Sequence, residues 1–156
     1  MVTALLSFGL LCVLSAILAW IDIRDGIIPD WLNLAIAGLG LIKIVLIGDP
    51  YAAIAAVGEG AVIGGAFWLL RQLYFAVRGV QGLGLGDVKF LGAAGIWVGV
   101  AGIPMLLLVA TMTALACVGV MQISGRALTA QTSMSFGPFL AAGLLLTSGL
   151  QQYGLF

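Results

Sequence analysis

Apolar stretches separated by short polar segments make up almost the whole sequence. A helix that crosses a membrane needs about 20 mostly apolar residues, and several stretches approach or exceed that length. The first is followed by the polar segment DIRDGIIPD, and the third by RGVQGLGLG. The predicted membrane helices cover residues 2–21, 31–47, 51–74, 87–100, 103–123 and 136–152.

The fourth and fifth of these helices come from one continuous apolar run, residues 87–121. A run of about 35 residues is too long for one crossing. Gly and Pro interrupt helices, so we place a break between Gly99 and Pro104. The pattern thus predicts an all-α, polytopic membrane protein of about six transmembrane helices, with residues 1–156 in a single membrane-embedded domain.

Composition supports lipid as the surrounding solvent. Hydrophobic residues make up 63% of the chain and charged residues 8%, whereas soluble domains carry about 25% charged residues. The net charge is zero, which argues against nucleic acid as a partner. The sequence contains no His and only two Cys, so we expect neither a metal site nor a cofactor.

Basic residues indicate how the chain is oriented. The loops after the first, third and fifth predicted helices contain Arg24, Arg78 and Arg126, whereas the other two loops contain no Lys or Arg. Lys and Arg are enriched in cytoplasmic loops. We therefore expect the three basic loops to face the cytoplasm.

Two aspartates occupy matching positions on that side. Asp22 lies where the first predicted helix ends, and Asp87 where the fourth begins. Two carboxylates that meet in a partly desolvated site share one proton, so one can accept a proton from water while the other donates. This chemistry needs no His, Cys or metal.

Simpler roles compete for the residues around the two aspartates. Asp87 at a helix N-terminus could act only as a cap, and Asp30 after Pro29 suits an N-cap too. Lys89 could extend to the membrane interface or approach Asp87. Gly84 and Gly86 leave the backbone unshielded, so an extended substrate could lie there. A dinucleotide site is a poor alternative, because no strand precedes these glycines.

Glu59 lies inside the third predicted helix, and acids at membrane depth are often functional. Lys43 lies at a similar depth in the second. We expect a structural ion pair between them, with a substrate contact at Glu59 as the alternative.

Three segments together carry a resemblance to a known family. GLGLGDVKF (residues 82–90) resembles the G-x-G-D-x-K signature of the type IV prepilin peptidases, within the GxGD class of aspartyl proteases. DIRDGIIPDWLN resembles the family's first aspartate motif, and SFGPFLAAG, which contains Gly137 and Pro138, resembles the segment that opens its last helix. The resemblance implies a GxGD-type bundle in the inner membrane that cuts the leader from type IV prepilins or pseudopilins on the cytoplasmic side.

By motif, the resemblance assigns Asp22 and Asp87 as the catalytic pair, with Asp22 preferred over Asp25 because it lies nearer the helix end. Pro29, Asp30, Gly84, Gly86, Lys89, Gly137, Pro138 and Glu59 are candidate substrate-binding or supporting residues.

Many bacterial members of the family also methylate the new N-terminus and carry a cysteine-rich segment. This sequence contains no C-x-x-C pair, so we expect the short, peptidase-only form without methyltransferase activity. Two other functions stay open: a small proton- or cation-coupled transporter that uses Asp22, Glu59 and Asp87, and a non-catalytic protein of pilus or secretion assembly. Both aspartates near one surface favour the peptidase.

Overall fold

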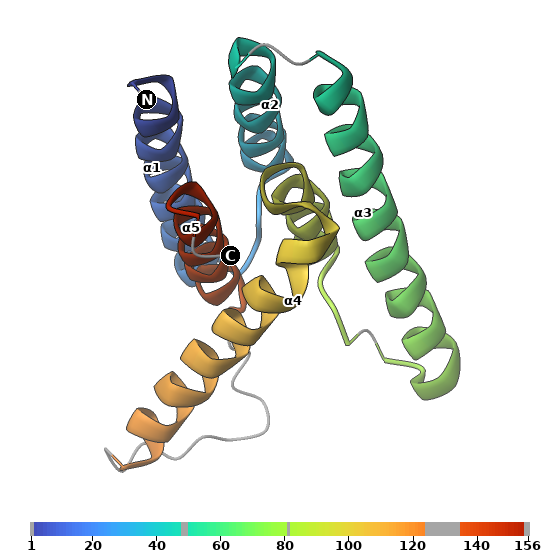
Figure 1. Cartoon of the computed structure of the whole chain (residues 1–156). Coiled ribbons are helices and arrows are strands. Elements are labelled where there is room, and N and C mark those ends of the chain that lie inside the picture. Colours follow the sequence, from blue (N-terminus) through green and yellow to red (C-terminus); the bar gives the residue numbers. More distant parts are fainter. Residues whose placement is uncertain (1, 48–49, 81, 124–134, 155–156) are drawn as a thin grey trace.

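The computed structural model describes residues 2–47, 50–80, 82–123 and 135–154, which form five helices and no strands (Figure 1). The helices are α1 (Val2–Asp25), α2 (Asp30–Ile47), α3 (Pro50–Arg78), α4 (Leu85–Ile123) and α5 (Gly137–Gln152). The first four are long and apolar enough to cross a membrane. This confirms the all-α class, and the predicted count of six was approximate.

The helices extend past some predicted bounds, since α1 continues to Asp25 rather than residue 21 and α3 to Arg78 rather than residue 74. Short-range signals in the sequence mark several of the observed ends. Gly26 adopts φ +66° directly after α1, a conformation that Gly adopts readily, and its N–H donates to the carbonyl of Asp22 at 2.9 Å. The carbonyl of Pro29 accepts the N–H of Leu32 at 3.1 Å as α2 begins. Pro138 lies in the first turn of α5, where its missing N–H costs nothing. Most of the fifth loop, with Arg126, and the second loop at residues 48–49 lie outside the described residues.

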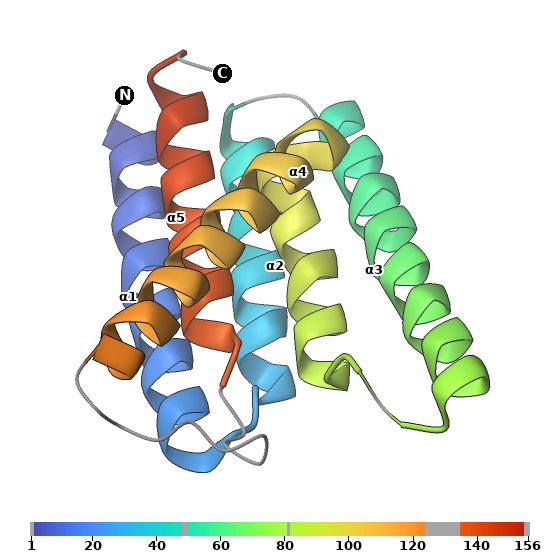
Figure 2. The ribbon, with the colours of Figure 1, turned by 90° about the horizontal axis from the view of Figure 1, so that it is seen from below.

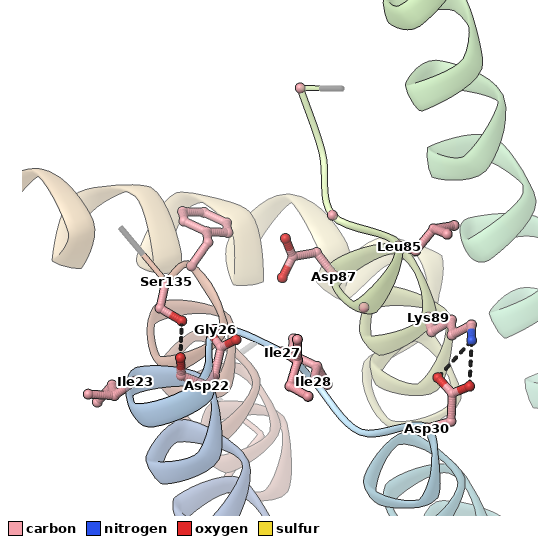
Figure 3. Close-up of a pocket in the computed structure, with 14 residues that line it drawn as sticks. Asp22, Ile23, Gly26, Ile27, Ile28, Asp30, Leu85, Asp87, Lys89 and Ser135 are labelled. Atoms are coloured by element: carbon pink, nitrogen blue, oxygen red, sulfur yellow. Dashed lines mark hydrogen bonds and ion pairs between the residues drawn. The ribbon is translucent and has the colours of Figure 1, made fainter. Parts of the chain in front are cut away.

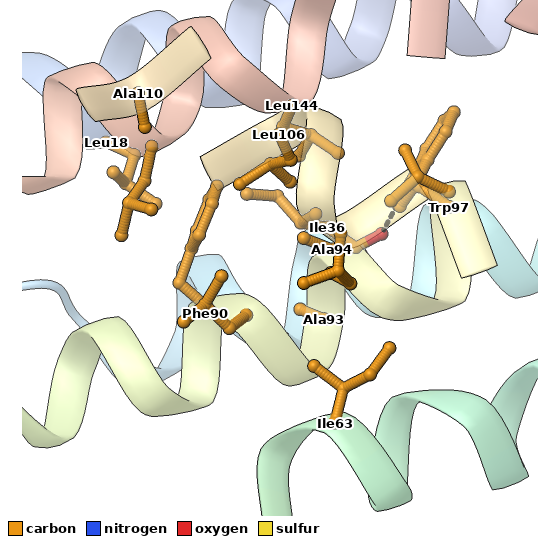
Figure 4. Close-up of a cluster of buried hydrophobic side chains, with 14 of the residues drawn as sticks. Leu18, Ile36, Ile63, Phe90, Ala93, Ala94, Trp97, Leu106, Ala110 and Leu144 are labelled. Atoms are coloured by element: carbon orange, nitrogen blue, oxygen red, sulfur yellow. Dashed lines mark hydrogen bonds between the residues drawn. The ribbon is translucent and has the colours of Figure 1, made fainter. Parts of the chain in front are cut away.

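The core is centred on α4, which packs against α2, α3 and α5. Phe90 and Leu106 of α4 are fully buried with Leu18 of α1, Ile36 of α2 and Leu144 of α5 (Figure 4). Many other apolar side chains, on all five helices, are exposed. An apolar exterior of this kind fits a protein surrounded by lipid.

Glycines bring α3 and α4 into backbone contact. A Cβ on Gly60 would lie 2.7 Å from the carbonyl oxygen of Gly92, and one on Gly95 would lie 3.2 Å from the Cα of Gly60. Small residues at such contacts let membrane helices approach closely. The segment GAAG (residues 92–95) of α4 forms this contact.

The chain of α4 changes direction at Gly99, as the predicted break requires (Figure 1). Gly99 has φ 68° and ψ 176°, which are not helical. Two side chains satisfy the backbone groups freed there: the Glu59 carboxylate accepts the N–H of Val100 at 3.0 Å, and Gln151 donates to the carbonyl of Val98 at 3.0 Å. Unpaired backbone groups are costly in lipid, so both contacts stabilise the break.

The predicted ion pair between Lys43 and Glu59 is wrong. Glu59 is directed to the break in α4, and the Lys43 ammonium lies 5.0 Å from the ring centroid of Trp97. The indole N–H of Trp97 donates to the carbonyl of Ile36 at 2.8 Å. A similar depth in the sequence does not decide which way each side chain points, and the Glu59 carboxylate binds the backbone N–H of Val100 instead.

Figure 2 shows that α1 and α3 end, and α2, α4 and α5 begin, at the same end of the bundle. The start of α1 and the end of α5 lie at the other end. The segments that carry the three motifs are therefore gathered on one side, as the alternation of basic loops predicted.

Candidate active site

A cavity of about 650 Å³ opens at the end of the bundle where the motif segments meet. Its walls come from the end of α1, the connection to α2, the start of α4 and the residues that precede α5. Asp22 and Asp87 both line it, and Figure 3 shows the two carboxyl groups on either side of a shared space. Residues far apart in the sequence therefore form one site with two acids.

Asp22 is buried, with only 5% of its surface exposed, and it is held by two hydrogen bonds. Its Oδ2 accepts the backbone N–H of Gly137 at 2.8 Å. Its own carbonyl accepts the hydroxyl of Ser135 at 2.6 Å. The start of α5 thus fixes both the side chain and the backbone of Asp22, and the positive end of that helix faces the carboxylate.

Gly137 fits this position because it has no side chain. A Cβ there would overlap Oδ2 of Asp22 and would lie 2.8 Å from its Cγ. The sequence pointed to Gly137 only through the resemblance of SFGPFLAAG. Contact with the aspartate 115 residues earlier could not be read from the chain, and the role of Ser135 was missed altogether.

Asp87 lies in the first turn of α4, where a helix N-terminus favours a negative charge. The backbone N–H of Gly84 hydrogen-bonds its carboxylate, and the charge of Asp22 acts on it directly. The carboxyl groups of Asp22 and Asp87 therefore lie close enough for their charges to interact.

The glycines before Asp87 allow close approaches that a side chain would block. A Cβ on Gly84 would lie 3.0 Å from the Asp87 carboxylate, and one on Gly86 would lie 2.9 Å from the Cβ of Ile28. Gly86 thus lets the connection between α1 and α2 pack against the start of α4. Both glycines line the cavity.

Lys89 lines the cavity and pairs with Asp30. Its ammonium is 2.7 Å from each carboxylate oxygen of Asp30 (Figure 3). Of the two alternatives for Lys89, the approach to Asp87 is wrong, and the Asp30 carboxylate binds Lys89 where a helix cap was expected. The pair joins the start of α2 to the start of α4.

Other candidates lie away from the two acids. Asp25 is exposed and lies 3.8 Å from Arg24, while Glu59 is on α3 at the break in α4. Neither lines the cavity. Pro29 and Pro138 act through the backbone, by starting α2 and α5.

In the described part of the chain, no three His, Cys, Asp or Glu side chains are grouped so that they could share a metal ion. The reactive groups of the cavity are two carboxyls, one hydroxyl and the Lys89–Asp30 pair. Such a set can transfer protons and polarise a carbonyl group.

Comparison with known proteins finds relatives over most of the chain. Residues 9–120 match the model of the type IV leader peptidase family. The chain is 37% identical over 141 residues to the prepilin leader peptidase/N-methyltransferase of Burkholderia pseudomallei (strain 1026b), covering 90% of this chain and 44% of the relative. The protein of the same name from Escherichia coli (strain K12) is 36% identical over 135 residues, with coverage of 85% and 57%.

The chain spans about half the length of these curated relatives. No solved structure matches it significantly. The family model covers both aspartate motifs, at Asp22 and at Asp87. By this match and by its identity to the curated relatives, the chain belongs to the type IV leader peptidase family.

Proposed function

We propose that this protein is an aspartic endopeptidase of the inner membrane that removes the leader from type IV prepilins or pseudopilins. The observation that carries the proposal is the shared cavity of Asp22 and Asp87, which come from two of the motifs. Relatives named prepilin leader peptidases support the substrate class.

The proposed reaction uses the two acids in opposite protonation states. The ionised carboxylate takes a proton from water as the water oxygen attacks the scissile carbonyl carbon. The protonated partner donates its proton to the carbonyl oxygen, which gives a tetrahedral diol. The carboxyl that took the proton from water then gives it to the peptide nitrogen, while the other carboxylate accepts a proton from a diol hydroxyl. The C–N bond breaks, the carbonyl re-forms as a carboxyl product, and the pair again holds one proton. Two neighbouring carboxyls disfavour simultaneous ionisation, which supports this division of roles.

The cavity faces the cytoplasm in this proposal. Arg24 and Arg78 lie at the end of the bundle where the cavity opens, and basic residues favour the cytoplasmic side. A leader that has not yet crossed the membrane would be accessible there.

Transport is supported less well than proteolysis. A proton or cation path through Asp22, Glu59 and Asp87 would need these acids along one route, yet Glu59 binds the backbone of α4 and is absent from the cavity wall. A purely structural assembly protein would gain nothing from two buried or half-buried acids that face one cavity.

Substitution of the two aspartates tests the proposal. Asp22→Asn and Asp87→Asn keep the shape of each side chain but remove the acid, so cleavage of a prepilin substrate in membranes should fall by at least about 10³-fold. Asp25→Asn is the matched control, since Asp25 is exposed outside the cavity, and it should retain most activity. Undiminished cleavage by Asp87→Asn would refute the mechanism.

A further inference from the structure

A second cavity, of about 480 Å³, lies between α2, α3 and α4 next to the first. Asp30 and Lys89 line both cavities, so their ion pair marks the boundary between them. From that boundary the second cavity runs along the three helices past Ala37, Ala61 and Ile96. We refer to it as the groove.

Beyond the Asp30–Lys89 pair at its boundary, the groove is lined by apolar side chains and by glycine, with one exception. Asn33 of α2 lines it, is only 5% exposed, and has neither an acceptor for its amide N–H groups nor a donor for its amide oxygen. Polar groups buried without partners are costly and are rare in folded proteins. An amide that stays unpaired in an otherwise apolar groove indicates a ligand that brings both a donor and an acceptor.

The groove is also open to the surrounding lipid. Leu34, which lines it, is 72% exposed, and Ala61 on the opposite wall is exposed as well. A ligand could therefore enter sideways from the membrane, without passing through the cavity of the two acids.

We propose that the groove holds the apolar, membrane-embedded segment of the substrate polypeptide, with the Asn33 amide hydrogen-bonded to the backbone of that segment. This inference rests on the proposed peptidase function. Continuity with the candidate active site supports it, because a chain lying across the two acids passes the Lys89–Asp30 pair directly into the groove. The first turn of an apolar helix has unpaired N–H groups, and the extended residue before it has a free carbonyl.

A lipid acyl chain is the competing occupant, and the Asn33 amide distinguishes a lipid from a peptide segment. An acyl chain has no hydrogen-bonding group and would leave the amide unpaired. A peptide backbone offers an N–H to the amide oxygen and a carbonyl to the amide nitrogen.

The kinetic test compares two substrates. One is a prepilin with its leader and a full apolar segment, and the other is a soluble peptide that covers only the leader and the scissile bond. Asn33→Leu preserves volume and removes the amide. We expect the ratio of kcat/KM for the long substrate to that for the short one to fall roughly three- to tenfold, the value of one or more hydrogen bonds, while the melting temperature is unchanged or higher.

Two neighbouring positions on α3 provide a second comparison. Ala61→Trp would fill the groove, whereas Val62 is 65% exposed and does not line it. Ala61→Trp should lower the same ratio, and Val62→Trp should leave it at the wild-type value. Equal ratios in Asn33→Leu, Ala61→Trp and the wild type would overturn the proposal, as would a fall that affects both substrates alike.

A cross-linking experiment is independent of turnover. In the Asp87→Asn background, a photoreactive benzoylphenylalanine at position 61 should cross-link to the apolar segment of the prepilin, and the same group at position 62 should not. Equal cross-linking from both positions, or none from position 61, would refute the proposal that the groove holds the apolar segment of the substrate. If the wild type cleaves neither substrate, the proposed function fails, and the cross-links still decide what occupies the groove.

Discussion

The substitution Gly137→Ala tests the contact that holds Asp22 in place. The added Cβ would overlap Oδ2 of Asp22 and approach its Cγ to 2.8 Å. The carboxylate must therefore rotate away, which breaks its 2.8 Å hydrogen bond to the Gly137 N–H. A hydrogen bond to a charged group contributes about 1.5–3 kcal/mol, or about 10- to 100-fold in rate. Displacement of a reacting group by about 1 Å costs about 10²-fold.

The two effects overlap, so we expect kcat/KM for prepilin cleavage to fall by about 10²-fold. Gly149→Ala is the control on the same helix, because a Cβ there meets the Phe8 ring at an ordinary 3.6 Å. Cleavage is measured in membranes beside the melting temperature of the purified protein. Wild-type kcat/KM in a folded Gly137→Ala protein would refute the argument that Gly137 positions Asp22.

Three further predictions concern other parts of the molecule. Lys89→Asp should lower the rate of cleavage several-fold, because it places two negative charges side by side between α2 and α4. Adding Asp30→Lys restores an ion pair of opposite direction and should recover most of the lost activity. No recovery in the double variant would mean that the pair does not position the site. Gly60→Ala should destabilise the protein by about 1–3 kcal/mol, because the added Cβ would meet the backbone of α4. Gly65→Ala is the control and should not destabilise it, because a Cβ there has nothing within 4 Å. Equal melting temperatures of the two variants would contradict the packing argument. Cleavage should survive EDTA, because carboxyl groups alone supply the proton transfers, and activity that disappears with EDTA and returns with added zinc would count against the aspartic mechanism.

Much of the fold follows from local signals in the sequence. The length of the apolar stretches predicted the helices, and the polar segment that contains Gly26 and Pro29 separated the first helix from the second. Gly99 was identified as part of a break because glycine interrupts helices. The alternation of basic loops correctly grouped the segments that contain Asp22 and Asp87 at one end. These inferences need only the chemistry of nearby residues.

Long-range partners were less accessible to sequence reasoning. We predicted an ion pair between Glu59 and Lys43 from their similar predicted depth. Depth along the membrane normal does not determine which side of its helix each residue is on, so it could not determine the partner. The break in α4 leaves the N–H of Val100 without a partner in the helix, and this N–H binds the Glu59 carboxylate. Lys89 likewise binds Asp30, 59 residues earlier, because the start of α2 lies beside the start of α4.

The break at Gly99 has a consequence for the depth of the candidate active site. The part of α4 that precedes it, residues 85–98, is about 21 Å long at about 1.5 Å per residue. The hydrocarbon core of a membrane is about 30 Å thick. This half-helix cannot reach from one membrane surface to the other. A break at the far surface leaves the start of the half-helix, at Leu85, roughly 9 Å below the near surface, and Asp87 lies deeper still. Water and the scissile bond would then meet below the level of the lipid headgroups, and the cavity would be the route by which water arrives.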